Sequence, residues 1–279
     1  MQQSRYRRRT LVRELVLVLV AVVYCLPFYL LVSIALETTA QTYRAPLSFP
    51  QPPHFGNFST AWRTGGQAGL GHALLASLVI TVSSVVGLIV LGSLCAYSLA
   101  RRAGRVADGV YVLFVVGIIL PFQLAIIPLY VGMRHLGLVG SYLGMIVLNV
   151  GLLMPLTVFL YTGFIRALPR DYEEAARVDG AGILLTFRCV VVPLLWPVTA
   201  TVAVLVGIIV WNEFFVALIF LAGSHAQTVP VALYSFVGGY VARWNLIFAG
   251  LAITIAPILA FYLFAQRHLI RGFSAGVKG

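Results

Sequence analysis

Few side chains in this 279-residue chain could carry out acid–base chemistry, and they are unevenly placed. The chain has eight Asp and Glu residues, and four of them lie within nine positions: Asp171, Glu173, Glu174 and Asp179. Clustered carboxylates can act as general acids and bases. Three of these four also sit where a short helix would begin, and negative charge is favoured there by the helix dipole.

The remaining polar residues do not form a recognisable catalytic or metal site. The histidines are scattered without the spacing of metal ligands, at positions 54, 72, 135, 225 and 268. Lys278 is the single lysine, so the chain cannot supply a Walker A loop, which ends in Lys-Ser/Thr and holds nucleotide phosphates. We therefore expect no enzyme activity, no metal and no cofactor in this chain.

The elements that must position these residues are membrane helices. The chain is 61% hydrophobic with a mean hydropathy of +0.98, and a membrane-spanning helix needs about 20 mostly apolar residues. Six apolar segments predict an all-α polytopic protein with one transmembrane domain over residues 1–279. The predicted spans are residues 15–36, 73–100, 110–133, 139–165, 189–221 and 246–265, the uncharged part of the fifth ending at Asn212.

The basic residues predict the orientation of these spans. The segments before span one and after spans two, four and six carry fifteen Lys and Arg residues, against four in the opposite segments. Because cytoplasmic loops carry the excess of Lys and Arg, both termini are predicted to be cytoplasmic. This topology accounts for the net charge of +11 without a nucleic-acid partner.

Residues 169–188, between spans four and five, predict a small helix-turn-helix on the cytoplasmic surface. Pro169 suits a first helical turn, Glu173 and Arg177 are spaced i, i+4, and Gly180 is placed to end the helix in a left-handed conformation. Small residues follow the acids, so another backbone could approach closely. On physical grounds alone, a solvated loop helix that keeps charge out of the bilayer explains this segment equally well.

The same segment, EEAARVDGAGILLTFRCVVVPLLWP, resembles the EAA motif of binding-protein-dependent ABC importer permeases. It matches at Glu174, Ala175, Ala176, Asp179, Gly180, Ala181, Phe187, Pro193 and Pro197. The stretches WNEFF, TVPVALYSFVGGYVARWN and RGFSAGVKG resemble the maltose-type branch of that family, which imports carbohydrates. The resemblance runs from span one to Gly279, with Glu213 where Asp is common and a C-terminal tail that is one residue shorter than usual.

The resemblance implies that residues 169–188 are the coupling element, which sits in a cleft of an ATPase subunit. The implied ATPase-coupling residues are Glu173, Glu174, Ala175, Ala176, Arg177, Asp179, Gly180, Ala181 and Phe187, with Arg271 and Lys278 as C-terminal ATPase contacts. ATP and Mg would be bound by that partner. The implied assembly has two ATP-hydrolysing subunits, a second permease subunit and an extracytoplasmic solute-binding protein, in the bacterial inner membrane. The second permease is expected to be a different chain, with a homodimeric pore as the alternative.

Two further groups of residues have alternative interpretations. Trp211, Asn212, Glu213 and Phe214 could line or gate a translocation path, because intramembrane carboxylates usually face a cavity; Glu213 could instead anchor its helix by hydrogen bonds. The loop residues Tyr234, Phe236, Gly238, Gly239 and Tyr240 would reach the binding protein according to the resemblance. Their aromatic rings could equally be interfacial membrane anchors.

The leading hypothesis is a permease subunit of an ATP-driven importer for a sugar or oligosaccharide. The alternatives are an autonomous secondary transporter or channel, an importer permease for another solute such as a glycerol phosphate, and a membrane scaffold without transport. A secondary transporter normally places several ionisable groups near the midplane. This chain offers Glu213 there, so an ion-driven mechanism has little support.

Overall fold

The computed structural model describes residues 8–45, 47–102, 104–238 and 240–255. Within these ranges the chain is built from helices and loops, with an isolated antiparallel bridge between Val237 and Ala242. The predicted all-α class is therefore confirmed. The chain divides into two compact units, residues 1–73 with 232–279 (unit 1) and residues 74–231 (unit 2).

Unit 1 is organised around the end of the first long helix, α1 (Arg8–Ala35). Two short helices follow it, α2 (Thr39–Arg44) and α3 (Gly56–Thr64), and then the start of α4 (Leu70–Arg101). Thr38 and Gln41 form a capping box at the start of α2, a reciprocal pair that satisfies two free amide groups. The helix Trp244–Ile255 completes the described part of this unit.

Three described helices are long and apolar enough to cross a membrane: Leu11–Ala35 within α1, α4, and α7 (Tyr142–Ala167). They coincide with the predicted spans 15–36, 73–100 and 139–165, because a run of apolar residues this long is most stable as a helix in lipid. The helix Trp244–Ile255 lies at the start of the predicted sixth span, whose remainder lies outside the described residues.

The predicted third span, residues 110–133, is not one continuous helix. It consists of α5 (Arg105–Ile119), the 3-10 turn η1 (Phe122–Ala125) and α6 (Ile126–His135). The two halves meet at an angle of 93°. The break falls at Leu120–Pro121, where proline lacks an amide hydrogen and disfavours helical geometry in the residue before it.

The predicted fifth span is also divided. The helical segment Ile183–Leu194 comprises α9 (Ile183–Thr186), the π-helical turn η2 (Phe187–Val191) and α10 (Val192–Leu194). It bends by 73° into α11 (Trp196–Trp211). Pro197 lies in the first turn of α11, where a missing amide hydrogen costs little, so the long helix begins at Trp196 and not at Cys189.

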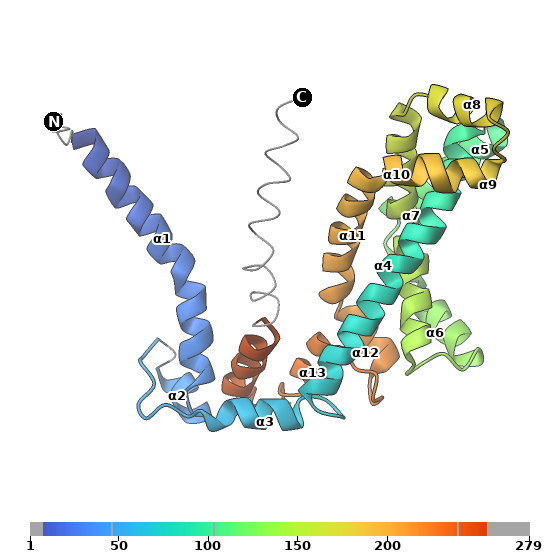
Figure 1. Ribbon diagram of the computed structural model, residues 1–279. Helices are drawn as coiled ribbons and strands as arrows, with labels where there is room; N and C mark the ends of the chain where they lie inside the picture. The colour runs from blue at the N-terminus through green and yellow to red at the C-terminus, as the bar shows by residue number, and fades with distance from the viewer. Residues whose placement is uncertain (1–7, 46, 103, 239, 256–279) are drawn as a thin grey trace. The chain divides into compact units, whose positions relative to one another are not determined.

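The core of unit 2 is formed around α7, which packs against α5, α11 and α12 (Phe215–Leu221). The buried residues of this core include Leu88, Val158, Tyr161, Val206 and Phe220. Helices α8 (Asp171–Val178) and α9 lie at one end of this unit, whereas α6 and α12 lie at the other (Figure 1). Helix α13 (Val229–Tyr234) follows α12.

Candidate functional site

The acidic stretch forms helix α8, with Asp171, Glu173 and Glu174 in its first turn. The helix ends as predicted at Gly180, whose φ is +84°. The amide of Ala181 donates to the carbonyl of Ala176 at 2.9 Å, and the amide of Gly180 donates to the carbonyl of Arg177 at 3.0 Å. These two hydrogen bonds form a Schellman motif, which requires a left-handed residue and therefore favours glycine.

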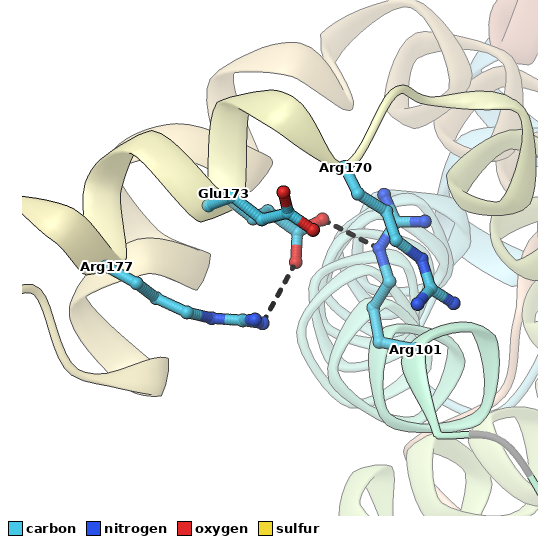
Figure 2. Close-up of a pocket in the computed structure, with 5 residues that line it drawn as sticks. Arg101, Arg170, Glu173 and Arg177 are labelled. Carbon is cyan, nitrogen blue, oxygen red and sulfur yellow. Dashed lines mark hydrogen bonds and ion pairs between the residues drawn. The ribbon is translucent and has the colours of Figure 1, made fainter.

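Glu173 is turned inward and is 3% exposed. Its carboxylate accepts a hydrogen bond from the Arg101 Nε at 2.7 Å and another from the Tyr97 hydroxyl at 2.9 Å. The predicted i, i+4 partner, Arg177, is 3.9 Å away on the solvent side. Figure 2 shows the Glu173 carboxylate between Arg101 and Arg177. A carboxylate with two charge-assisted donors is well satisfied in a buried position.

Arg101 links three helices at this point. It ends α4, it is paired with Glu173 of α8, and its Nη2 donates to the carbonyl of Leu168 at 3.2 Å, immediately after α7. The Tyr97 ring, one turn earlier on α4, packs on Phe187 with centroids 5.1 Å apart. The ends of α4 and α7 are therefore joined to both halves of the helix-turn-helix.

The expected ATPase-coupling residues divide into two groups. Glu173 and Phe187 are buried against α4, so their side chains stabilise the helix-turn-helix from within. Ala176 and Ala181 are half-buried, and the other members of the set are exposed: Glu174, Ala175, Arg177, Asp179 and Gly180. The exposed group is the part that a partner protein could touch directly.

Large apolar side chains lie beside these exposed residues. Val178 is 87% exposed at the end of α8, and Ile183, Leu184 and Leu185 on α9 are exposed as well. Next to them, Arg101, Arg170, Glu173, Glu174 and Arg177 line a small pocket of about 90 Å³. Exposed apolar residues beside charged ones are typical of a protein interaction surface.

Glu213 has a structural role in the loop before α12. Its two carboxylate oxygens accept hydrogen bonds from the amides of Val216 and Ala217, both at 2.8 Å. The acid therefore caps the N-terminus of α12, where negative charge is favoured. The Asn212 amide nitrogen donates to the carbonyl of Ile208 at 2.8 Å, and Trp211 and Phe214 are half-buried beside it. These contacts match the anchoring interpretation of Glu213.

The loop expected to face a binding protein is only partly available for contact. Tyr240 is fully exposed, Tyr234 and Gly238 are exposed, and Phe236 is buried at 2% exposure. Because its side chain is buried, Phe236 cannot be a surface contact as expected; the chain turns just after it, at the bridge between Val237 and Ala242. Gly239, Arg271 and Lys278 lie outside the described residues.

Two contributors to this site, Tyr97 and Arg101, were missed by sequence reasoning. Arg101 ends an uncharged run, and the adjacent Arg102 carries the same charge, so charge alone does not identify the partner of Glu173. Within the described ranges, no group of three or more His, Cys, Asp and Glu residues could hold a metal ion.

The fold and this site define a class of protein: a polytopic α-helical membrane protein with an exposed helix-turn-helix held by a buried ion pair. A family model for the binding-protein-dependent transport system inner membrane component matches residues 88–275. The chain belongs to this family, and it is therefore an inner-membrane transport component.

Two curated relatives align with nearly the full length of the chain. It is 37% identical over 276 residues to the melibiose/raffinose/stachyose import permease MelC of Bacillus subtilis strain 168, covering 97% of this chain and 99% of the relative. It is 31% identical over 261 residues to a probable starch degradation products transport system permease, AmyC, of Thermoanaerobacterium thermosulfurigenes, covering 93% of both chains.

A solved structure supports the fold. A chain in the crystal structure of a bacterial ABC transporter involved in import of the acidic polysaccharide alginate superposes with a TM-score of 0.72. The match covers 96% of this chain and 98% of that chain, at 21% sequence identity. The predicted permease fold is thus confirmed.

Proposed function

We propose that this chain is a permease subunit of an ATP-driven importer for a sugar or oligosaccharide, with helix α8 and its turn as the ATPase docking element. The observation that carries the proposal is the arrangement of α8. Its outer face exposes Glu174, Asp179 and Val178, while its inner face is fixed to α4 by Glu173. The relatives named for melibiose, raffinose, stachyose and starch products favour a carbohydrate substrate.

In this proposal, closure of two partner ATPase subunits around ATP and Mg moves the docking element. Because Arg101 and Tyr97 bind Glu173, a displacement of α8 is passed to the end of α4 instead of being absorbed by a loose loop. The spans would then exchange between inward- and outward-facing states, whose relative populations depend on which state the ATPase stabilises. Arg271 and Lys278 stay predicted as additional ATPase contacts.

The extracytoplasmic part of the proposal concerns the loop after α13. Tyr234, the last residue of α13, and Tyr240, in the loop, have exposed side chains and are proposed to contact a solute-binding protein. Trp211, Asn212 and Phe214 are proposed to border the translocation path. Glu213 would act there through the α12 N-terminus that it caps, and not as a ligand for sugar.

The proposed topology has six spans with both termini in the cytoplasm. The described helices provide three spans, or up to five if each bent pair crosses the membrane once, and the helix Trp244–Ile255 would begin the sixth. The bias of fifteen cytoplasmic against four external Lys and Arg residues supports this orientation. Accessibility of single cysteines to a membrane-impermeant thiol reagent, placed at Tyr240 and at Val178, tests it.

The function is tested by purifying the tagged chain in mild detergent and identifying the associated proteins by mass spectrometry. We expect an ATPase, a second and different permease chain, and a solute-binding protein captured by crosslinking in intact membranes. The captured binding protein is then screened against mono- and oligosaccharides and glycerol phosphates. Recovery of this chain alone after crosslinking contradicts the proposal and favours an autonomous transporter.

The docking element is tested by the substitution Val178→Asp. Val178 is 87% exposed, so a charge there should leave the fold intact but place an uncompensated carboxylate in the ATPase interface. Losing a well-buried interface contact costs about 2 kcal/mol or more, so recovery of the ATPase should fall roughly 30-fold. The control is Leu136→Asp, exposed after α6 at the other end of unit 2. Equal ATPase recovery by both variants would argue against docking through α8.

A further inference from the structure

A second glutamate, Glu37, is buried in unit 1 just beyond the end of α1. The residue is 0% exposed. Neither carboxylate oxygen accepts a hydrogen bond from any residue that the structure describes. An ionised carboxylate without a partner is very costly to bury, so this group must either be neutral or lie next to a compensating charge.

The hydroxyls of Ser33 and Thr42 lie beside the carboxyl. The Ser33 hydroxyl donates to the carbonyl of Ser48 at 3.0 Å, and the Thr42 hydroxyl donates to the carbonyl of Thr38 at 3.1 Å. A hydroxyl has a single hydrogen to donate. Both hydrogens are therefore already used, and the two oxygens present lone pairs beside a group that is itself an acceptor.

The charged side chains of the adjoining segments do not compensate Glu37. Arg44 at the end of α2, His54 before α3, Arg63 on α3 and Arg243 before the helix Trp244–Ile255 are all exposed. Burial of the Glu37 carboxyl away from water is the main cause that raises its pKa. The two hydroxyls would lower this pKa if they donated to the carboxylate, but they are directed to the Ser48 and Thr38 carbonyls. With no paired cation among the residues that the structure describes, acceptors that face one another require a hydrogen between them.

The backbone holds Glu37 in this buried position. The Asn57 amide nitrogen donates to the carbonyls of Ala35 and Glu37 at 2.9 and 2.8 Å, and the His54 amide donates to the carbonyl of Leu36 at 2.8 Å. The Asn57 carbonyl oxygen in turn accepts from the Asn245 amide at 3.0 Å. The end of α1, the start of α3 and the helix Trp244–Ile255 thus meet at Glu37.

We propose that the Glu37 side chain is a proton-binding site: the carboxyl is held neutral in the folded chain, and its ionisation weakens the junction of α1, α3 and the helix Trp244–Ile255. The proton on one carboxyl oxygen supplies the donor that the Ser33 and Thr42 oxygens lack. This inference concerns the folding of unit 1, and it stands whether or not the transported solute is a sugar.

The direction of the pH dependence follows from the raised pKa. The folded chain binds the proton on Glu37 more tightly than the unfolded chain, in which the group has its ordinary pKa of 4.5. The stabilisation is therefore present in full below pH 4.5 and is lost as the pH rises through the folded-state pKa. Raising the pH should loosen unit 1 over this window.

The test measures the unfolding temperature of the full-length chain in detergent, by tryptophan fluorescence, at a series of pH values from 4.5 upward. Wild type is compared with Glu37→Gln, which keeps the shape and stays neutral. We expect the two to converge at the acidic end. Between the unfolded-state and folded-state pKa values, the unfolding temperature of wild type should then drop below that of Glu37→Gln by roughly 3–5 °C for each pH unit. The control, Asp108→Asn, removes an exposed acid and should follow wild type.

Parallel pH profiles for wild type and Glu37→Gln would overturn the proposal. A metal cation that raises the unfolding temperature of wild type at high pH, but not that of Glu37→Gln, would also overturn it, because the site would then bind that cation instead of a proton. If Glu37→Gln does not fold, infrared spectra of wild type and Asp108→Asn test whether the Glu37 carboxyl is protonated. The carbonyl band of a protonated carboxylic acid should persist well above pH 4.5 in both, and its loss by that pH would refute the site.

Discussion

The two units each bury one glutamate, and they neutralise it in different ways. Glu173 in unit 2 accepts hydrogen bonds from Arg101 and Tyr97 and is close to Arg177. Glu37 in unit 1 has no donor among the described residues and lies beside two hydroxyls whose hydrogens are used elsewhere. Burial raises the pKa of Glu37, whereas Glu173 has a fixed cation 2.7 Å away.

The difference teaches that burial of an acid does not by itself reveal its charge state. A buried pair is expensive to break, because removing one partner leaves the other charge without compensation. A buried neutral acid can be replaced by an amide at little cost. The same substitution, Glu to Gln, should therefore have opposite effects on stability at the two positions.

The largest effect is expected for Glu173→Gln. The amide cannot neutralise Arg101, whose side chain is 11% exposed, so the folded chain should lose about 3 kcal/mol of stability. At pH values above the pKa of Glu37, Glu37→Gln should instead stabilise. Thermal unfolding of both variants, with exposed Glu174→Gln as the control, checks this contrast. If both substitutions destabilised the chain to a similar extent, the hypothesis that Glu173 is ionised and Glu37 is neutral would be contradicted.

A double substitution sharpens the interpretation of Glu173. In Arg101→Met with Glu173→Leu, both charges are replaced by apolar groups, and such replacements are often neutral in stability. We expect the double variant to recover most of the stability lost in Glu173→Gln. If stability returns but ATPase-dependent uptake does not, the ion pair is needed for transmission and not only for folding.

An intermediate effect is expected for Tyr97→Phe. The substitution removes one hydrogen bond to a charged acceptor, worth about 1.5–3 kcal/mol, while Arg101 still neutralises Glu173. The ring contact with Phe187 can be kept, so the loss should fall near the lower value. Chemical denaturation of wild type and Tyr97→Phe measures it. A loss equal to that of Glu173→Gln would mean that the hydroxyl, and not the guanidinium, is the main partner.

The sequence predicted those features that depend on residue type and on short spacing. Long uncharged runs predicted α1, α4 and α7, and Gly180 predicted the left-handed end of α8. The bend before Trp196 and the break at Pro121 were missed, since a proline in an apolar run is compatible with either a kinked span or a break. Proline alone does not decide between them.

The partners of the two buried glutamates could not be predicted, for a different reason. Arg101 and Glu173 are 72 residues apart in the sequence, and their meeting depends on how α4 and α8 are rotated. Arg101 and Arg102 offer the same charge at neighbouring positions, and only one of them faces Glu173. The spacing of Glu173 and Arg177, in contrast, was visible in the sequence, and the structure places that pair at 3.9 Å.

The smallest effect is expected for Arg177→Gln, although this pair was the one visible in the sequence. The Arg177 side chain is 56% exposed and its closest nitrogen–oxygen distance to Glu173 is 3.9 Å, so solvent screens the attraction and its contribution should be about 0–0.5 kcal/mol. The unfolding temperature should barely change. Recovery of the ATPase should fall measurably, because Arg177 is on the exposed face of α8. A large loss of stability would show instead that Glu173 is balanced by both arginines, and that its contrast with Glu37 depends on more than the single buried pair.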